Sequence, residues 1–247
     1  MTKKAPKAYK DQQFLNSREA RTLRIMAEYL EPEARLKKFN IQHTVVFFGS
    51  ARLKPDGRRT IDKAYWVAEE LAYRLAVLSH EMELTGKNFC ICTGGGPGIM
   101  EAANRGANRA HANTIGYNIS LPMEQEPNDY LTPELNFEFH YFFMRKLWFM
   151  YHAKAVVVFP GGFGTLDELF EVLMLVQTQK LNKRMIPILL YDKEFWDEII
   201  NINKLVEHRL ISREDRDLIQ FFSSADEGFE IIKSKLGKMI ASVNHVK

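Results

Sequence analysis

Residues 155–173 read AVVVFPGGFGTLDELFEVL, an apolar run that passes through three glycines into a helix-like pattern. A run that is apolar at every position, such as AVVVF, is typical of a strand buried on both faces of a parallel sheet. The glycines allow a sharp turn and a close approach of the backbone to a ligand. The stretch therefore predicts a strand–turn–helix unit of a Rossmann-like fold, with its turn at a ligand-binding edge.

The same alternation of apolar runs and helical periodicity extends over most of the chain. Strands are expected at 43–49, 88–93, 114–120, 136–140, 155–160 and 185–191. Helices are expected at 13–38, 60–82, 98–111, 141–153, 165–179, 193–209 and 225–242. Because crossovers between parallel strands are right-handed, this order predicts an α/β, doubly wound, mostly parallel sheet with helices on both faces.

We expect two parts in the chain: an N-terminal tail and helical extension over 1–40, and a single Rossmann-like domain over 41–247. The 247 residues are 46% hydrophobic and 26% charged, as in an ordinary globular protein. The formal net charge of +3 is small, so neither nucleic acid nor a membrane surface is expected as a partner.

The expected location is the cytoplasm, because no apolar segment is long enough to span a bilayer and no signal-peptide core follows Met1. The chain has two cysteines, Cys90 and Cys92, which lie on one face of a predicted strand. We expect two buried thiols rather than a disulfide or a metal site. No metal ion and no cofactor is expected.

The first glycine-rich loop, CTGGGPGIMEAANRGA at 92–107, contains Gly94, Gly95, Gly96 and Gly98. At the start of a helix, such a loop offers free N–H groups and the positive end of the helix dipole to a phosphate. The dinucleotide fingerprint is incomplete, because Glu101 stands where its last glycine belongs, and no Walker lysine follows the loop. A tight turn that needs glycine for packing alone is the alternative explanation.

The second loop, PGGFGTLDE at 160–168, allows two interpretations. Thr165 and Glu168 have the spacing of a capping box, in which Thr165 would cap the helix and Glu168 would reach back to the backbone. That structural role leaves Gly161, Gly162 and Gly164 unexplained. An anion site formed by the glycines is the functional interpretation.

Arg145 and Lys146 lie near the start of the predicted helix 141–153. Cations there oppose the helix dipole, which costs a few tenths of a kcal/mol to about 1 kcal/mol when they are unpaired. A carboxylate or phosphate partner at the same edge of the sheet would remove this cost. The alternative is that both side chains extend into water.

Taken together, GGGPGIMEAANRGA, MRK and PGGFGTLDE, in this order and spacing, resemble the LONELY GUY (LOG) family over about residues 43–200. Its members are cytokinin riboside 5′-monophosphate phosphoribohydrolases, related to bacterial nucleotide nucleosidases and often labelled lysine decarboxylase-like. The resemblance implies cleavage of the N-glycosidic bond of a purine nucleoside 5′-monophosphate, giving free base and ribose 5-phosphate. It also implies a homodimer or a higher homo-oligomer.

The resemblance assigns roles to individual residues. Arg145 and Glu168 match the catalytic pair. The other matches are with residues that bind phosphate or line the nucleotide pocket, namely Ser50, Gly94, Gly95, Gly96, Gly98, Lys146, Gly161, Gly162, Gly164 and Thr165. Further possible substrate contacts are Met100, Glu124 and Glu126. About forty residues before the first strand and a long 120–140 loop resemble the longer bacterial members, so AMP or another purine monophosphate is as good an expectation as a cytokinin nucleotide.

Three other functions are compatible with a Rossmann-like sheet. A non-catalytic nucleotide or cofactor carrier of the same fold has no need of the Arg145/Glu168 pair. A pyridoxal-phosphate decarboxylase needs a Schiff-base lysine, and none stands beside either glycine loop. An NAD(P)-dependent oxidoreductase is disfavoured by Glu101 in the fingerprint.

Overall fold

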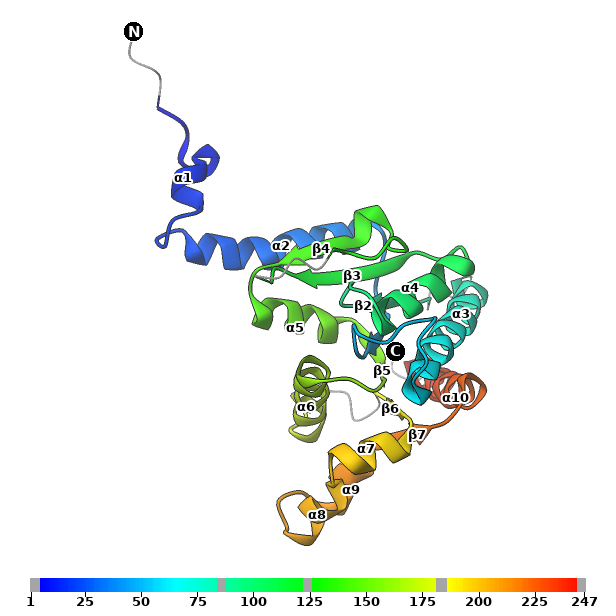
Figure 1. The fold of residues 1–247 in the computed structure, drawn as a ribbon. Coiled ribbons are helices and arrows are strands. Elements are labelled where there is room, and N and C mark those ends of the chain that lie inside the picture. The colour runs from blue at the N-terminus through cyan, green and yellow to red at the C-terminus, as the bar shows by residue number, and fades with distance from the viewer. Residues whose placement is uncertain (1–4, 84–87, 122–125, 181–185, 244–247) are drawn as a thin grey trace.

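The computed structural model describes residues 5–83, 88–121, 126–180 and 186–243 (Figure 1). Within them lies one sheet of seven strands in the order β4-β3-β2-β1-β5-β6-β7, with every neighbouring pair parallel. The strands are β1 (Thr44–Phe48), β2 (Cys90–Thr93), β3 (Thr114–Ile119), β4 (Asn136–Phe139), β5 (Ala153–Val158), β6 (Ile188–Tyr191) and β7 (Ile219–Phe222). The strand order reverses between β1 and β5, which confirms the doubly wound α/β sheet.

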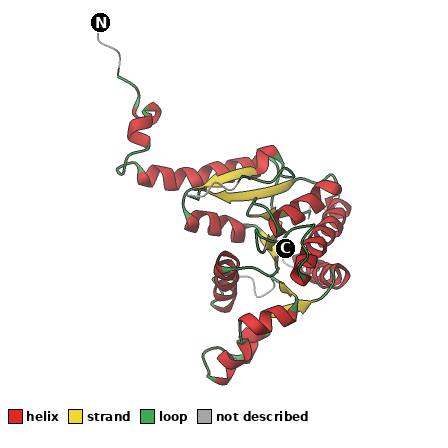
Figure 2. Ribbon diagram, in the orientation of Figure 1, coloured by secondary structure: helices red, strands yellow, loops and turns green. Residues whose placement is uncertain are grey.

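Helices cover both faces of the sheet (Figure 2). On one face pack α2 (Arg21–Lys38), α5 (Phe142–Tyr151), α6 (Phe163–Gln177) and α7 (Lys193–Ile199). On the other face pack α3 (Lys63–Glu83), α4 (Ile99–Arg109) and α10 (Ala225–Val243). Shorter elements are α1 (Gln12–Leu15), α8 (Ile202–Glu207), α9 (Arg213–Arg216) and the 3-10 turns η1 (Ala8–Lys10), η2 (Thr60–Asp62) and η3 (Pro133–Leu135).

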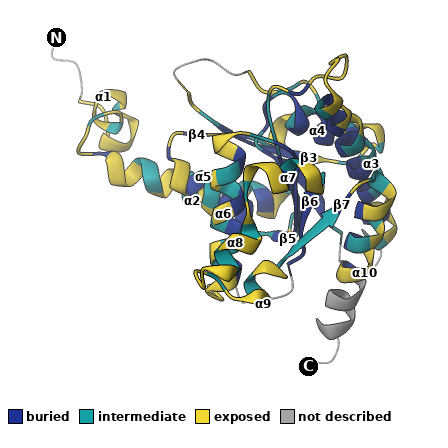
Figure 3. Ribbon diagram, turned by 60° about the horizontal axis from the view of Figure 1, so that its bottom comes forward, coloured by how far each residue is buried: buried dark blue, intermediate teal, exposed yellow. Residues whose placement is uncertain are grey.

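The core consists of two layers, one on each face of the sheet. Successive residues of β1 alternate between them: Val46 and Phe48 enter one layer, and Val45 and Phe47 enter the other. Figure 3 shows this burial along the central strands, in contrast to the exposed surfaces of α1, α8 and α9. Each fully buried side chain of this size contributes about 1.5–3 kcal/mol. Cys90 and Cys92 are free and buried, as predicted.

The predicted helix 13–38 is in fact two helices, α1 and α2. Arg24 donates to the backbone oxygens of Leu15 and Ser17, at 2.7 and 2.6 Å, and so stabilises the turn between them. α1 and the first part of α2 project from the rest of the molecule (Figure 1). Further along α2, the Glu28 backbone oxygen accepts a hydrogen bond from Trp148 Nε1 at 2.9 Å, which fixes α2 to α5.

Two further expectations about the C-terminal third are corrected. The predicted helix 193–209 is divided into α7 and α8, because the Asn201 side chain accepts from the Lys204 N–H and starts a new helix. The strand β7 was not predicted. It lies at the sheet edge and only Phe222 is buried in it, so the sequence shows no continuous apolar run. None of the described helices has the length and apolar character needed to cross a membrane.

Candidate active site

The candidate site lies where the strand order reverses, at the carboxyl ends of β1 and β5. Ser50, two residues after β1, connects the loops that meet there. Its N–H donates to the Pro160 oxygen at 3.0 Å, and its own backbone oxygen accepts from the Ile99 N–H at 3.1 Å. The loop after β1 is thereby joined both to the second glycine loop and to the first turn of α4. Ligands of open α/β sheets bind at such a point.

A cleft of about 770 Å³ opens between these loops. Its lining residues are Gly49, Ser50, Ala51, Arg52, Met100, Arg145, Gly161, Gly162, Phe163, Gly164, Thr165, Leu166, Glu168 and Ile199. The volume is within the range of small-molecule sites. The structure therefore brings the second glycine loop, the Arg145/Glu168 pair, Ser50 and Met100 together as predicted, and adds Arg52, Phe163 and Ile199, which the sequence did not single out.

The glycines of the first loop do not line the cleft, but they pack against two residues that do, Ser50 and Met100. Gly95 and Gly98 have φ of +76° and +70°, a conformation that favours glycine. A Cβ on Gly98 would lie 2.3 Å from the Ser50 oxygen, and a Cβ on Gly94 would lie 2.8 Å from Met100 Sδ. Close packing against Ser50 and Met100 thus explains Gly94 and Gly98, whereas a ligand contact by these glycines remains a prediction.

A buried amide network, which the sequence analysis missed, holds this loop in place. Asn104 is fully buried, accepts from Thr93 Oγ1 at 2.7 Å and donates to Thr114 Oγ1 at 2.6 Å. Asn128 donates to Asn104 Oδ1 at 2.9 Å and to the oxygens of Gly95 and Gly96, both at 3.0 Å. Because buried amides are costly unless they are hydrogen-bonded, this network fixes the loop conformation.

The second glycine loop corrects the capping interpretation. α6 begins at Phe163 with Gly162 as its N-cap, no side chain caps it, and its first turn carries no acid. Thr165 is buried and is the third residue of α6, not its N-cap. A Cβ on Gly161 would lie 2.2 Å from Thr165 Oγ1. Glu168 therefore does not form a capping box with Thr165. The uncapped N-terminus presents the positive end of the helix dipole to the cleft.

Glu168 instead pairs with Arg145 across the cleft, with Arg145 Nη2 donating to Glu168 Oε1 at 2.6 Å. Their side chains are only 12% and 13% exposed. Lys146, the next residue, pairs with Asp167 at 2.7 Å and with Glu171 at 3.1 Å, and it does not line the cleft. The expected carboxylate partners of the two cations are confirmed, and the alternative in which both extend into water is wrong.

Two electrostatic features distinguish this ion pair. Burial raises the pKa of Glu168 to about 7, although the charge of Arg145 and its hydrogen bond act in the opposite direction. Arg145 Nε is buried without a hydrogen-bond partner in the described part of the chain. A carboxyl group with a pKa near neutrality can gain or release a proton during a reaction, and a buried free donor can bind a ligand.

The structure tests only one of the two acids predicted as substrate contacts in the 120–140 loop. Glu124 lies outside the described residues, and Glu126 is exposed and does not line the cleft. Among the described residues, no three His, Cys, Asp or Glu side chains are grouped as metal ligands would be.

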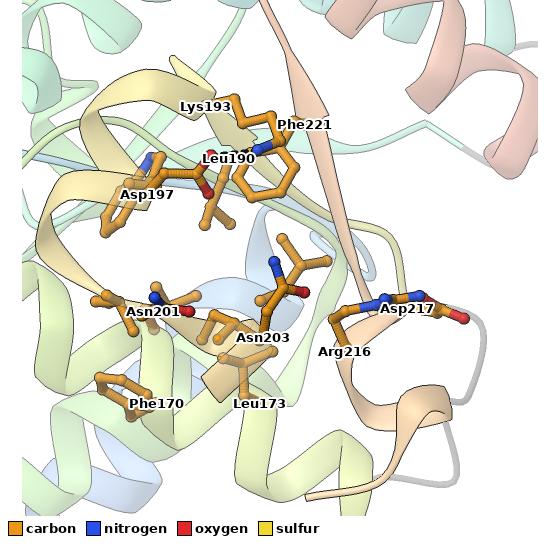
Figure 4. Close-up of a pocket in the computed structure, with 15 residues that line it drawn as sticks. Phe170, Leu173, Leu190, Lys193, Asp197, Asn201, Asn203, Arg216, Asp217 and Phe221 are labelled. Atoms are coloured by element: carbon orange, nitrogen blue, oxygen red, sulfur yellow. Dashed lines mark hydrogen bonds and ion pairs between the residues drawn. The ribbon is translucent and has the colours of Figure 1, made fainter. Parts of the chain in front are cut away.

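A second cavity, of about 470 Å³, lies on the other side of α6, between that helix, α7 and the strands β6 and β7. Figure 4 shows Asn201 and Asn203 in its wall, with the Lys193–Asp197 ion pair at one edge. None of the predicted site residues lines it. Because Glu168 lines the cleft whereas the adjacent Leu169 lines this cavity, α6 separates the two spaces.

The part of the chain that carries the candidate site resembles a known protein family. Residues 100–232, more than half of the chain, match the family described as "Possible lysine decarboxylase". The chain belongs to this family. It is the LOG family that the motifs predict, and the matched residues include Arg145, the second glycine loop and Glu168.

Two curated relatives of this LOG-family chain carry enzyme names. Over 132 residues it is 32% identical to the pyrimidine/purine nucleotide 5′-monophosphate nucleosidase of Escherichia coli (strain K12), a match covering 49% of this chain and 28% of that protein. Over 163 residues it is 28% identical to a cytokinin riboside 5′-monophosphate phosphoribohydrolase of Arabidopsis thaliana, covering 64% and 74%. The chain thus spans 28% of the length of the first relative.

Solved structures share the fold of this LOG-family chain. A molybdenum cofactor binding protein from Rippkaea orientalis superimposes with a TM-score of 0.52 at 21% identity, over 78% of this chain and 96% of that one. The Moco carrier protein from Chlamydomonas reinhardtii gives a TM-score of 0.50 at 19% identity, over 80% and 99%. At these identities the likeness concerns the fold alone.

Proposed function

We propose that this protein hydrolyses the N-glycosidic bond of a purine nucleoside 5′-monophosphate, either AMP or a cytokinin riboside monophosphate, to free base and ribose 5-phosphate. The observation that carries this proposal is the buried Arg145–Glu168 pair, which lines a cleft beside the uncapped N-terminus of α6. The names of the Escherichia coli and Arabidopsis thaliana relatives support it.

In this proposal the substrate lies along the start of α6. The 5′-phosphate binds the first turn, where Gly161, Gly162 and Gly164 leave the backbone accessible and the helix dipole favours an anion. Glu168 is the sixth residue of α6, so at about 1.5 Å per residue it lies roughly 7 Å further along the helix. The ribose then reaches the carboxylate while the phosphate anchors the part of the substrate that does not react.

Loss of the base leaves positive charge on the ribose ring, in an oxocarbenium-like transition state. The ionised Glu168 stabilises that charge, and it orients or deprotonates the attacking water or forms a transient ribosyl ester. Arg145 favours this ionised form and opposes the effect of burial, which raises the pKa of Glu168. Water supplies the hydroxyl group at C1′ and the proton that the leaving base takes up.

The site fits the decarboxylase activity named in the family description less well than it fits hydrolysis. That chemistry requires a lysine that forms a Schiff base with pyridoxal phosphate. No lysine is among the described residues that line the cleft, and Lys146 is engaged by Asp167 and Glu171. A carrier without activity is the remaining alternative, which an assay separates from the enzyme.

That assay incubates the protein with AMP, GMP, CMP, UMP and isopentenyladenosine monophosphate and measures the free base by chromatography. We expect release of base from at least one purine nucleotide, together with one equivalent of ribose 5-phosphate. Binding of a nucleotide without release of base from any of the five would contradict the proposal and favour the carrier.

We further propose a homodimer or a higher homo-oligomer as the functional unit. Exposed apolar side chains lie on α2, α5 and α6, three of the helices on one face of the sheet: Leu23, Met26, Leu30, Phe142, Phe143, Leu147, Tyr151, Phe170 and Met174. A second copy covering them would remove apolar surface from water.

We also propose the division into an extension over 1–40 and a domain over 41–247, and a cytoplasmic location. The two free thiols are compatible with a reducing compartment.

A further inference from the structure

Arg52 differs from the other arginine of the cleft in having no carboxylate partner. Arg145 is paired with Glu168, whereas Arg52, which is exposed at the cleft, makes no ion pair with any residue in the described ranges. Glu168 is the only acid among the described lining residues. Among the described residues, the cleft therefore contains one cation, Arg52, whose charge no acid balances.

The backbone of Arg52 is fixed on both sides. Its N–H donates to Ser50 Oγ at 3.1 Å, and its carbonyl oxygen accepts from Arg59 Nη2 at 3.0 Å. Because Ser50 is itself bonded to Pro160, the position of Arg52 is linked directly to the second glycine loop.

Asp62 stabilises the other end of the loop that follows β1 and carries Arg52. Its side chain is 3% exposed, and it accepts from Arg59 Nη2 at 2.7 Å, from Arg59 Nε at 3.1 Å and from the Arg59 N–H at 3.0 Å. The Arg59 side chain lowers the pKa of Asp62 to about 2, so the pair stays charged at neutral pH. A Cβ on Gly57 would lie 2.2 Å from the Asp62 carboxylate, which shows how closely the loop packs around it. Arg52 is thus presented by a constrained loop.

We propose that Arg52 binds the 5′-phosphate of the substrate together with the first turn of α6, and thereby makes the site select nucleotides over nucleosides. This inference rests on the proposed function. A phosphate carries close to two negative charges, and a helix N-terminus supplies the equivalent of about half a positive charge. Arg145 is already paired with Glu168. Arg52 therefore supplies the remaining positive charge that the phosphate needs, and its paired N–H groups match the phosphate oxygens.

The test compares Arg52→Ala and Arg52→Lys with Arg58→Ala. Arg58 is an exposed arginine of the same loop that does not line the cleft, so its variant loses the same charge without touching the proposed site. Steady-state rates are measured for AMP and for adenosine, and the affinity for ribose 5-phosphate is measured by calorimetry at low and high salt.

We expect Arg52→Ala to raise the KM for AMP and the Kd for ribose 5-phosphate by about ten- to a hundredfold, since a charged hydrogen bond to phosphate is lost. Its kcat and its rate with adenosine should stay close to those of the wild type, and its ribose 5-phosphate affinity should depend less on salt. Arg52→Lys should be intermediate, and Arg58→Ala should match the wild type.

Equal KM and Kd values for Arg52→Ala and Arg58→Ala would overturn the inference, as would a wild-type protein that binds no ribose 5-phosphate. The binding measurement separates this inference from the proposed function. If no nucleotide is cleaved but ribose 5-phosphate affinity still depends on Arg52, the proposed hydrolysis is wrong and the role of Arg52 in binding phosphate stands.

Discussion

Arg145 Nη2 lies 2.6 Å from Glu168 Oε1, and this contact joins α5 to α6 at the edge of the cleft. The pair is largely buried, so both charges lose most of their hydration. Buried ion pairs are often no more stabilising than apolar side chains of similar volume, whereas removing one partner costs about 3–5 kcal/mol. A costly pair beside a cleft, with a carboxyl pKa near neutrality, is typical of a functional site.

Removal of Arg145 should shift the pH dependence of activity. In the wild type, kcat/KM should rise with pH through about 7 as Glu168 loses its proton. Arg145 acts against the effect of burial, so Arg145→Ala should move the midpoint upward by about one pH unit or more. In Arg145→Lys, which keeps the positive charge, the midpoint should lie between those of Arg145→Ala and the wild type. Rates measured from pH 5 to 9 would contradict the account if the midpoint of Arg145→Ala stays in place or falls.

Glu168 should also make the stability of the fold depend on pH. Its pKa is 4.5 in the unfolded chain and about 7 in the folded one, so between these values only the folded state still binds the proton. Its stabilising contribution is therefore complete below pH 4.5 and is lost as the pH rises through 7, by up to roughly 3 kcal/mol. Urea unfolding of the wild type and of Glu168→Gln, from pH 4.5 to 7.5, should show a shallower decline for the variant; parallel curves would disprove this.

Two glycines of the second loop should respond differently to alanine. A Cβ on Gly164 meets nothing within 4 Å, so Gly164→Ala should keep or raise the stability, by up to about 1 kcal/mol, because alanine is the better helix former. A methyl group at that place on the cleft wall should nevertheless raise the KM for AMP about tenfold. A Cβ on Gly161 would collide with Thr165, so Gly161→Ala should unfold at a lower temperature. Unchanged AMP kinetics in Gly164→Ala would argue against phosphate binding at this turn.

The apolar face over α2, α5 and α6 should be the contact between copies of the chain. Leu147 lies on α5 and is 38% exposed, and we expect Leu147→Asp to reduce the oligomer to a monomer because a buried unpaired charge is costly. Val77, 37% exposed on α3 on the other face of the sheet, provides the matched control as Val77→Asp. Light scattering after gel filtration measures the masses. The same mass for both variants would place the contact elsewhere.

Much of the fold could be predicted because buried parallel strands are recognisable in the sequence as apolar runs. Residues 45–48 of β1 and 155–158 of β5 are buried on both faces, so each is a continuous apolar run that leads into a glycine or proline turn. Parallel strands end at one edge, so the sequence alone predicts that the second glycine loop and Arg145 lie close together. β7 lacks this signal because the sheet edge leaves most of its residues only half-buried.

The partners of individual side chains were harder to predict. The spacing of Thr165 and Glu168 satisfies a local capping rule, but α6 begins two residues before Thr165 and Arg145 supplies a stronger partner from another helix. Similarly, Arg52 follows Ser50 in an ordinary loop sequence, and its place at the cleft depends on Arg59 and Asp62 further along the chain. Contacts between distant segments decide both cases, and no local pattern contains them.

The most direct test of the central claim is the release of adenine from AMP by Glu168→Gln. The matched control is Glu171→Gln, the same change one turn along α6 at a residue that pairs with Lys146 and does not line the cleft. We expect Glu168→Gln to bind AMP within about tenfold of the wild type but to lose at least about a hundredfold in kcat, while Glu171→Gln stays active. Release of adenine by Glu168→Gln at the wild-type rate would contradict the assignment.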